Sequence, residues 1–92
     1  MATHAHQAVK EGIIATVRYR SRSKMQMPVL DLTIGGCMVE ARGWGVKPEE
    51  RVSVKLPGLE SISATVVWME DERAGLAFEE PLYGPTLESL LA

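Results

Sequence analysis

Asp31 and Thr33 stand two residues apart in the stretch DLTIGG, which ends in Gly35 and Gly36. In an extended strand, residues two apart project from the same face, so the carboxylate and the hydroxyl can act together. Such oxygens can accept hydrogen bonds from N1 and N2 of a guanine base. The glycines supply a positive φ or let a ligand approach the backbone closely. The stretch predicts either a plain turn between strands or a turn that is also half of a binding site.

A second group of chemically useful residues is the basic run RYRSRSK. Its members occupy alternate positions, Arg18, Arg20, Arg22 and Lys24. In a strand they share one face, where arginine can give bidentate contacts to phosphate. The alternative is a row of solvated charges that protects a sheet edge from aggregation. The pattern alone leaves both interpretations open.

Catalysis finds little support among the remaining residues. The only histidines, His4 and His6, have no serine or cysteine partner nearby in the sequence. Cys37 follows a glycine pair at the start of a strand, which favours a buried small apolar residue over a reactive thiol. The acidic run 70–72 is typical of a solvated hairpin tip. We therefore expect no enzyme, no cofactor and no metal site.

Composition limits the class of protein further. The 92 residues suffice for one domain with one modest core. A hydrophobic fraction of 46% and a charged fraction of 24% are those of an ordinary globular protein. The net charge of −2 gives no general attraction to nucleic acid, and no apolar run is long enough to enter a membrane. A single cysteine excludes an internal disulfide and indicates a cytoplasmic location.

Period-two alternation is the main structural signal. Residues 1–11 show no clear period and are expected to form a flexible tail, and residues 12–92 to form the domain. Six alternating runs and a short helix that begins at Gly84-Pro85 predict an all-β, six-stranded antiparallel barrel with a C-terminal helix. Trp44, in a glycine-rich loop, is expected to be the more exposed tryptophan. The side chains predicted to be largely buried are Val17, Val54, Leu56, Val66, Trp68 and Phe78.

The order of these features resembles the PilZ domain family. DLTIGG matches the family signature [D/N]-x-[S/T]-x-x-G, with Asp31, Thr33 and Gly36 in the defining positions. The strand VRYR, the pair VSVKLPGLESISATVVW and the final AGLAF follow in the family's order, and the resemblance covers about Gly12 to Phe78. It implies a six-stranded barrel that binds the bacterial messenger cyclic di-GMP, with the aspartate turn reading a guanine edge.

The family's second half-site is an RxxxR motif before the first strand, and here the sequence departs from it. The two arginine positions fall near His6 and Lys10, in HQAVK, whereas Arg18 and Arg22 spell RxxxR inside the first strand. Lysine lacks the planar fork of arginine, so binding is expected to be weak. The predicted ligand-binding residues are Asp31, Thr33, Gly35, Gly36, Arg18, Arg20, Arg22 and Lys10.

Two functions remain open at this point. The first is a receptor that binds cyclic di-GMP and passes the signal to an unidentified effector protein, as the lack of an attached output domain suggests. The second is a protein–protein interaction adaptor that has kept the barrel but lost the ligand.

Overall fold

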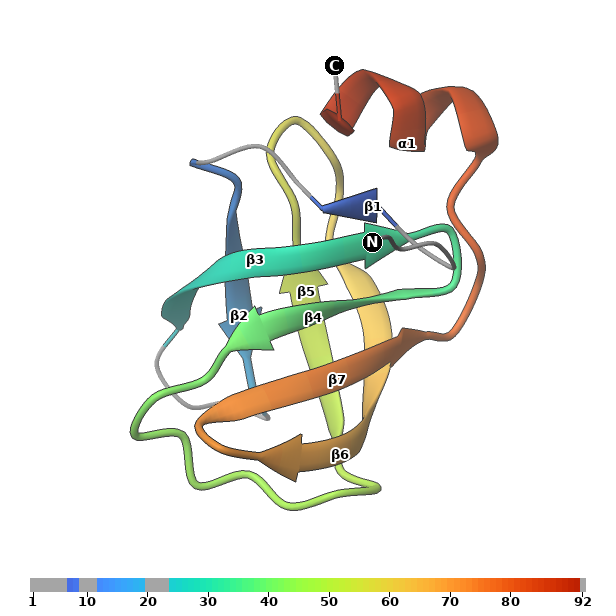
Figure 1. Cartoon of the computed structure of the whole chain (residues 1–92). Helices are drawn as coiled ribbons and strands as arrows, with labels where there is room; N and C mark the ends of the chain where they lie inside the picture. Colours follow the sequence, from blue (N-terminus) through green and yellow to red (C-terminus); the bar gives the residue numbers. More distant parts are fainter. Residues whose placement is uncertain (1–6, 9–11, 20–23, 92) are drawn as a thin grey trace.

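The computed structural model describes residues 7–8, 12–19 and 24–91, which form seven strands and one helix (Figure 1). The elements in chain order are β1 Gln7–Ala8, β2 Ile14–Arg18, β3 Met25–Thr33, β4 Gly36–Glu40, β5 Arg51–Lys55, β6 Ile62–Glu70, β7 Arg73–Phe78 and α1 Gly84–Leu91.

Six of these strands close into a barrel. Each pairs antiparallel with its neighbours in the order β3, β2, β5, β6, β7, β4, and pairing of β4 with β3 completes the ring. Helix α1 lies at one end of the barrel (Figure 1). The predicted fold, a six-stranded antiparallel barrel with a short C-terminal helix, is confirmed.

The short strand β1 differs from the expected flexible tail over residues 1–11. Gln7 pairs with Leu32 and Ala8 pairs with Asp31, so β1 extends the sheet beside β3. An isolated strand of this length has no periodicity that a sequence can reveal, because its order comes from the partner strand. The rest of the expected tail lies outside the described residues.

Strand β5 and the turn after it follow the sequence closely. Val52 and Val54 point into the barrel, and the residues between them point outward. Leu59 N donates to Leu56 O at 3.1 Å and Gly58 has φ 78°, which is the geometry of a type II turn. Pro57 and Gly58 therefore occupy the two central positions of this turn.

The barrel interior is filled by side chains from all six ring strands. Five of the six residues predicted to be buried are in this core: Val17, Val54, Leu56, Val66 and Phe78. The helix also packs against it, with Leu87, Leu90 and Leu91 partly buried. In the part of the chain that the structure describes, no helix has the length and apolar character needed to cross a membrane.

Trp68 is the exception, and the prediction that it anchors the core is wrong. Its side chain is 38% exposed, because the register between β6 and β7 shifts after Val66. Val66 pairs with Leu76 and Trp68 pairs with Gly75, so Val67 is an extra residue in a β-bulge. Both Val67 and Trp68 then lie outside the core.

The other tryptophan takes the more buried position. Trp44 is half-buried and packs against the core, so the expected order of exposure of the two tryptophans is reversed. It lies in the loop that leads from β4 towards β5, next to buried Val46.

We expect Leu56→Ala to destabilise the domain far more than Trp68→Ala. Leu56 is fully buried, and truncating such a leucine costs about 2–5 kcal/mol through lost burial and the cavity it leaves. Because Trp68 is exposed, its replacement by alanine should lower the free energy of unfolding by about 1 kcal/mol, the average for a point substitution. Urea unfolding of the two variants measures the difference. Equal losses would show that the bulge does not place Trp68 outside the core.

Candidate ligand-binding site

The turn between β3 and β4 is stabilised by its own hydroxyl. Thr33 Oγ1 accepts a hydrogen bond from Gly35 N at 3.2 Å and donates one to Gly36 O at 3.3 Å. Backbone hydrogen bonds also connect the turn to the end of β7 and to the segment that follows it. Ile34 O accepts from Leu82 N at 2.7 Å, and Gly35 O accepts from Phe78 N at 2.9 Å. The stretch DLTIGG is therefore a well-fixed structural turn.

Neither glycine of the turn has a positive φ, which was one of the two roles that the sequence suggested for them. Positive φ angles occur at Gly12, Gly43 and Gly58 among the described glycines, and not at Gly35 or Gly36. A Cβ atom at Gly36 would overlap the carbonyl oxygen of Leu76 in β7, whereas one at Gly35 would meet open space. The close approach at Gly36 is thus made by a neighbouring strand of the barrel.

A pocket of about 260 Å³ opens on the outer surface beside this turn. Asp31, Thr33 and both glycines line it, so the structure brings these four predicted site residues together. Asp31 is half-buried and pairs with Met38 in β4, just after a register shift that follows Val29. The other residues that line this pocket are Cys37, Met38, Val67, Trp68, Gly75, Leu76 and Ala77.

Trp68 is the lining residue that sequence reasoning missed. A Cβ atom at Gly75 would collide with the indole ring, so the ring packs directly on the Gly75 backbone. It remains 38% exposed within the same pocket as Asp31. The bulge after Val66 exchanges the inward and outward positions of β6. The alternation of Ile62 to Val66 does not reveal it, so the sequence carries no signal for the position of Trp68.

The predicted cations are not brought to this pocket by the described structure. Arg18 lines a different pocket, which shares no residue with the first. Its strand meets β3 at Met25, the partner of Val17, and Asp31 lies further along β3 by roughly 20 Å at ~3.3 Å per residue. His6, Lys10, Arg20 and Arg22 lie outside the described residues.

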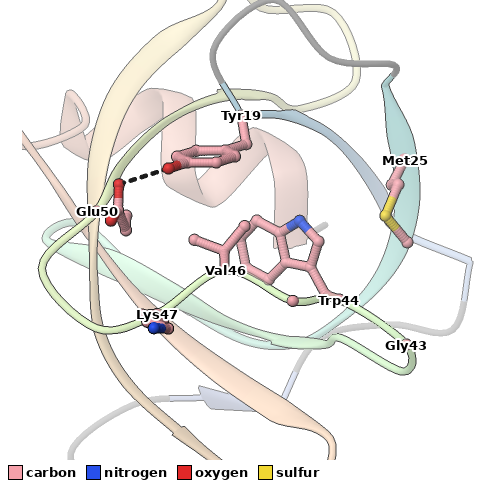
Figure 2. A pocket seen from close by; sticks show the side chains of 8 residues that line it. Tyr19, Met25, Gly43, Trp44, Val46, Lys47 and Glu50 are labelled. Atoms are coloured by element: carbon pink, nitrogen blue, oxygen red, sulfur yellow. Dashed lines mark hydrogen bonds between the residues drawn. The ribbon is translucent and has the colours of Figure 1, made fainter.

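A larger pocket of about 620 Å³ lies at the β2 end near the loop after β4 (Figure 2). Tyr19 Oη donates to Glu50 Oε1 at 2.8 Å across it, and Trp44 lies beside Val46 on its floor. None of the predicted site residues that the structure describes lines this pocket, and it shares no described residue with the DLTIGG pocket.

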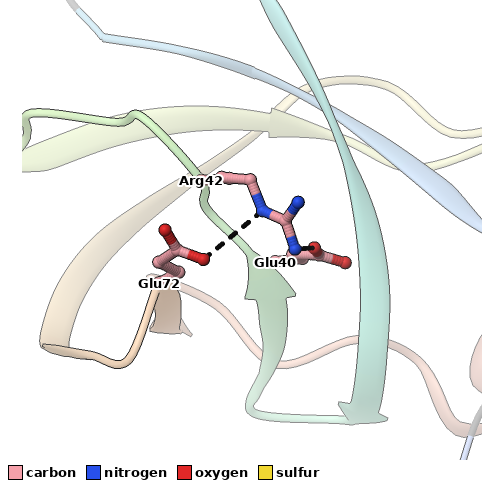
Figure 3. A network of polar contacts seen from close by, with 3 residues as sticks. All are labelled: Glu40, Arg42 and Glu72. Carbon is pink, nitrogen blue, oxygen red and sulfur yellow. Dashed lines mark ion pairs between the residues drawn. The ribbon is translucent and has the colours of Figure 1, made fainter.

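The acidic hairpin tip is a surface feature, as its sequence suggested. Asp71 and Glu72 are exposed and form the turn between β6 and β7. Arg42 lies between Glu40 and Glu72, with N–O distances of 2.8 and 3.4 Å (Figure 3). Within residues 7–8, 12–19 and 24–91, no group of histidine, cysteine and acidic side chains could hold a metal ion.

The comparison with known families agrees with this geometry. The sequence profile of the PilZ domain matches residues 7–91, nearly the whole chain. The chain belongs to the PilZ domain family. PilZ domains are binding domains rather than catalysts, and the family is known for binding cyclic di-GMP. No curated protein matches the chain significantly.

Gly36→Ala should destabilise this PilZ domain, because the added methyl group would meet the backbone of β7. Overpacking of this kind costs about 1–3 kcal/mol. The matched control is Gly35→Ala, which should change stability by no more than about 0.5 kcal/mol, since its Cβ meets nothing. Thermal unfolding of both variants tests the contact. A Gly36→Ala melting temperature equal to that of the control would disprove it.

Cys37 should be inert towards thiol reagents in the folded domain. Burial raises the pKa of its thiol to about 12, because the thiolate would lose its solvation. The reactive thiolate is then scarce at pH 8, whereas an unfolded cysteine with a pKa of about 8.5 ionises there. Iodoacetamide labelling with and without urea measures the contrast. Because unfolding releases this proton, the domain should lose stability as the pH rises above about 8.5.

Proposed function

We propose that this PilZ domain is a cyclic di-GMP receptor whose DLTIGG pocket takes one guanine base of the ligand. The observation that carries the proposal is the exposed indole of Trp68 in the same pocket as the carboxylate of Asp31. An aromatic face stacks on a base, and a carboxylate accepts hydrogen bonds from the N1–H and N2–H groups that only guanine presents together. The two residues, on β3 and β6, thus offer base selectivity and affinity within one pocket.

The size of the pocket supports a single base rather than the whole ligand. Pockets that enclose a complete small molecule measure roughly 300–1,000 Å³, whereas this one measures about 260 Å³. The phosphates and the second base would then lie outside it and need contacts elsewhere.

The source of the phosphate contacts is the weaker half of the proposed site. No cation lines the pocket among the described residues. β1 runs beside Asp31, and Lys10 follows β1 closely in the sequence. We propose Lys10 for the phosphates, because Arg20 and Arg22 follow Arg18 in the chain at the end of β2 that lies away from Asp31. Lysine gives a point charge without the arginine fork, so we propose weak binding.

A binding domain needs a partner to have an effect. We propose that the liganded domain passes the signal to an effector protein in the cytoplasm, where the free thiol of Cys37 stays reduced. The alternative is an interaction adaptor that does not bind the ligand, and the lack of a described cation in the pocket favours it.

Isothermal titration of the full chain with cyclic di-GMP should show binding that Asp31→Ala and Trp68→Ala both weaken. Loss of a charged acceptor should reduce affinity roughly 10- to 100-fold, and loss of base stacking by a similar factor. The control is Asp71→Ala, which removes one carboxylate from the exposed hairpin tip and should leave affinity unchanged.

Three outcomes would count against the proposal. Absence of heat and of a ligand-induced melting shift at millimolar ligand would leave the adaptor function. Unchanged affinity in Trp68→Ala would place the base elsewhere. An unfolded Asp31→Ala variant would show that this carboxylate serves its own turn.

A further inference from the structure

A second polar pocket, of about 210 Å³, lies on the outer surface of β2 and β5. We call it the basic pocket and define it by its lining residues: Thr16, Arg18, Lys24, Ser53, Lys55 and Ser61. Among the described residues, the lining combines three cations with three hydroxyl groups and includes no carboxylate. Such a composition stands out in a chain whose net charge is −2.

Strand register explains why these side chains meet. Thr16 pairs with Lys55 and Arg18 pairs with Ser53 across β2 and β5. Directly opposed residues have Cβ atoms about 4.5–5.5 Å apart, so their side chains share one patch of surface. The residue between them, Val17, points into the core. The cations are therefore directed outward by the same alternation that fills the barrel.

One of the cations is held in place. Lys55 Nζ donates to Leu59 O at 2.6 Å, across the turn that Gly58 makes possible with its positive φ. An ammonium group has three donors, so two remain for a ligand. Arg18 and Lys24 form no ion pair with any residue of the described part of the chain, and both are exposed. The positive charge of the basic pocket is thus left unneutralised.

We propose that the basic pocket is a second anion site that binds a phosphate group, separate from the DLTIGG pocket. Arginine and lysine give charge-assisted hydrogen bonds to phosphate oxygens, and the three hydroxyl groups can donate to the oxygens that the cations do not reach. Three cations attract a phosphate group, which carries close to two negative charges, more strongly than a carboxylate, which carries one.

The two sites lie on different parts of the barrel. The basic pocket is built on β2 and β5, whereas the DLTIGG pocket is built on the β3–β4 turn with β6 and β7, and no residue lines both. In the ring order, β2 and β5 are not neighbours of β4 or β7 (Figure 1). Phosphate binding here therefore does not depend on the proposed cyclic di-GMP function.

The test is an NMR titration of the full chain with inorganic phosphate, with chloride used to keep the ionic strength constant. We expect amide shifts centred on Thr16, Ser53, Lys55 and Ser61. Lys55→Gln and Arg18→Gln should each weaken binding about tenfold, the order expected for one charge-assisted contact. The matched control is Lys47→Gln, which removes an exposed lysine outside the basic pocket and should change the affinity less than twofold.

A second titration distinguishes a phosphorylated protein from a small phosphorylated molecule as the ligand of the basic pocket. A phosphoserine peptide and its unphosphorylated form are compared with inorganic phosphate. Tighter binding of the phosphopeptide alone supports the site and assigns it to a phosphorylated partner. Equal binding of phosphopeptide and inorganic phosphate supports the site and assigns it to a small phosphorylated molecule.

Two results would overturn the inference. If Lys47→Gln weakens phosphate binding as much as Lys55→Gln and Arg18→Gln do, the affinity depends only on the overall charge of the chain. Competition between phosphate and cyclic di-GMP that disappears in Arg18→Gln would show that these cations hold the phosphates of that ligand, which would support the receptor and remove the separate site. A chain that binds phosphate but no cyclic di-GMP would reject the receptor and leave this inference intact.

Discussion

The barrel depends on the contact between β4 and β7 at Gly36, where two backbones come so close that no side chain fits between them. Gly36 pairs with Ala77 in β7 and with Thr33 in β3, so it joins the last two pairings that close the ring. A Cβ there would overlap Leu76 O. The glycine of the family signature is thus required by strand packing in this chain, whether or not a ligand binds.

The same short stretch combines a structural role with the recognition role that we propose for it. The hydroxyl of Thr33 stabilises the turn through hydrogen bonds with Gly35 N and Gly36 O. Asp31 lies in a paired strand before the turn and lines the pocket outside it. The turn therefore fixes the backbone that carries the carboxylate, and the structural role and the proposed recognition role belong to different residues.

The basic pocket and the DLTIGG pocket both use outward positions of the barrel strands, which core packing leaves unconstrained. On β2 and β5 the outward positions hold Arg18 and Lys55, and alternation continues undisturbed. On β6 the bulge at Val67 moves Trp68 outward, and Gly75 leaves the space in which its ring lies. One extra residue in a strand thus adds an aromatic face to the pocket that Asp31 lines.

The sequence by itself determined the barrel, most of its core and the turn chemistry. Val52, Val54 and Leu56 alternate because a strand presents successive side chains to opposite faces, and Pro57-Gly58 prescribes a type II turn through local φ preferences. These rules act between residues that are close in the chain. Membership of the PilZ domain family follows from the order of the same local features.

Only the tertiary structure decided which of the predicted site residues meet. The pairing of β1 with β3, the bulge in β6 and the neighbour that Gly36 excludes all depend on partner strands that lie far away in the sequence. Periodicity carries no information about such partners. For this reason Arg18, which the sequence grouped with Asp31 in one ligand set, lines another pocket, and Trp68, expected inside the barrel, lines the same pocket as Asp31.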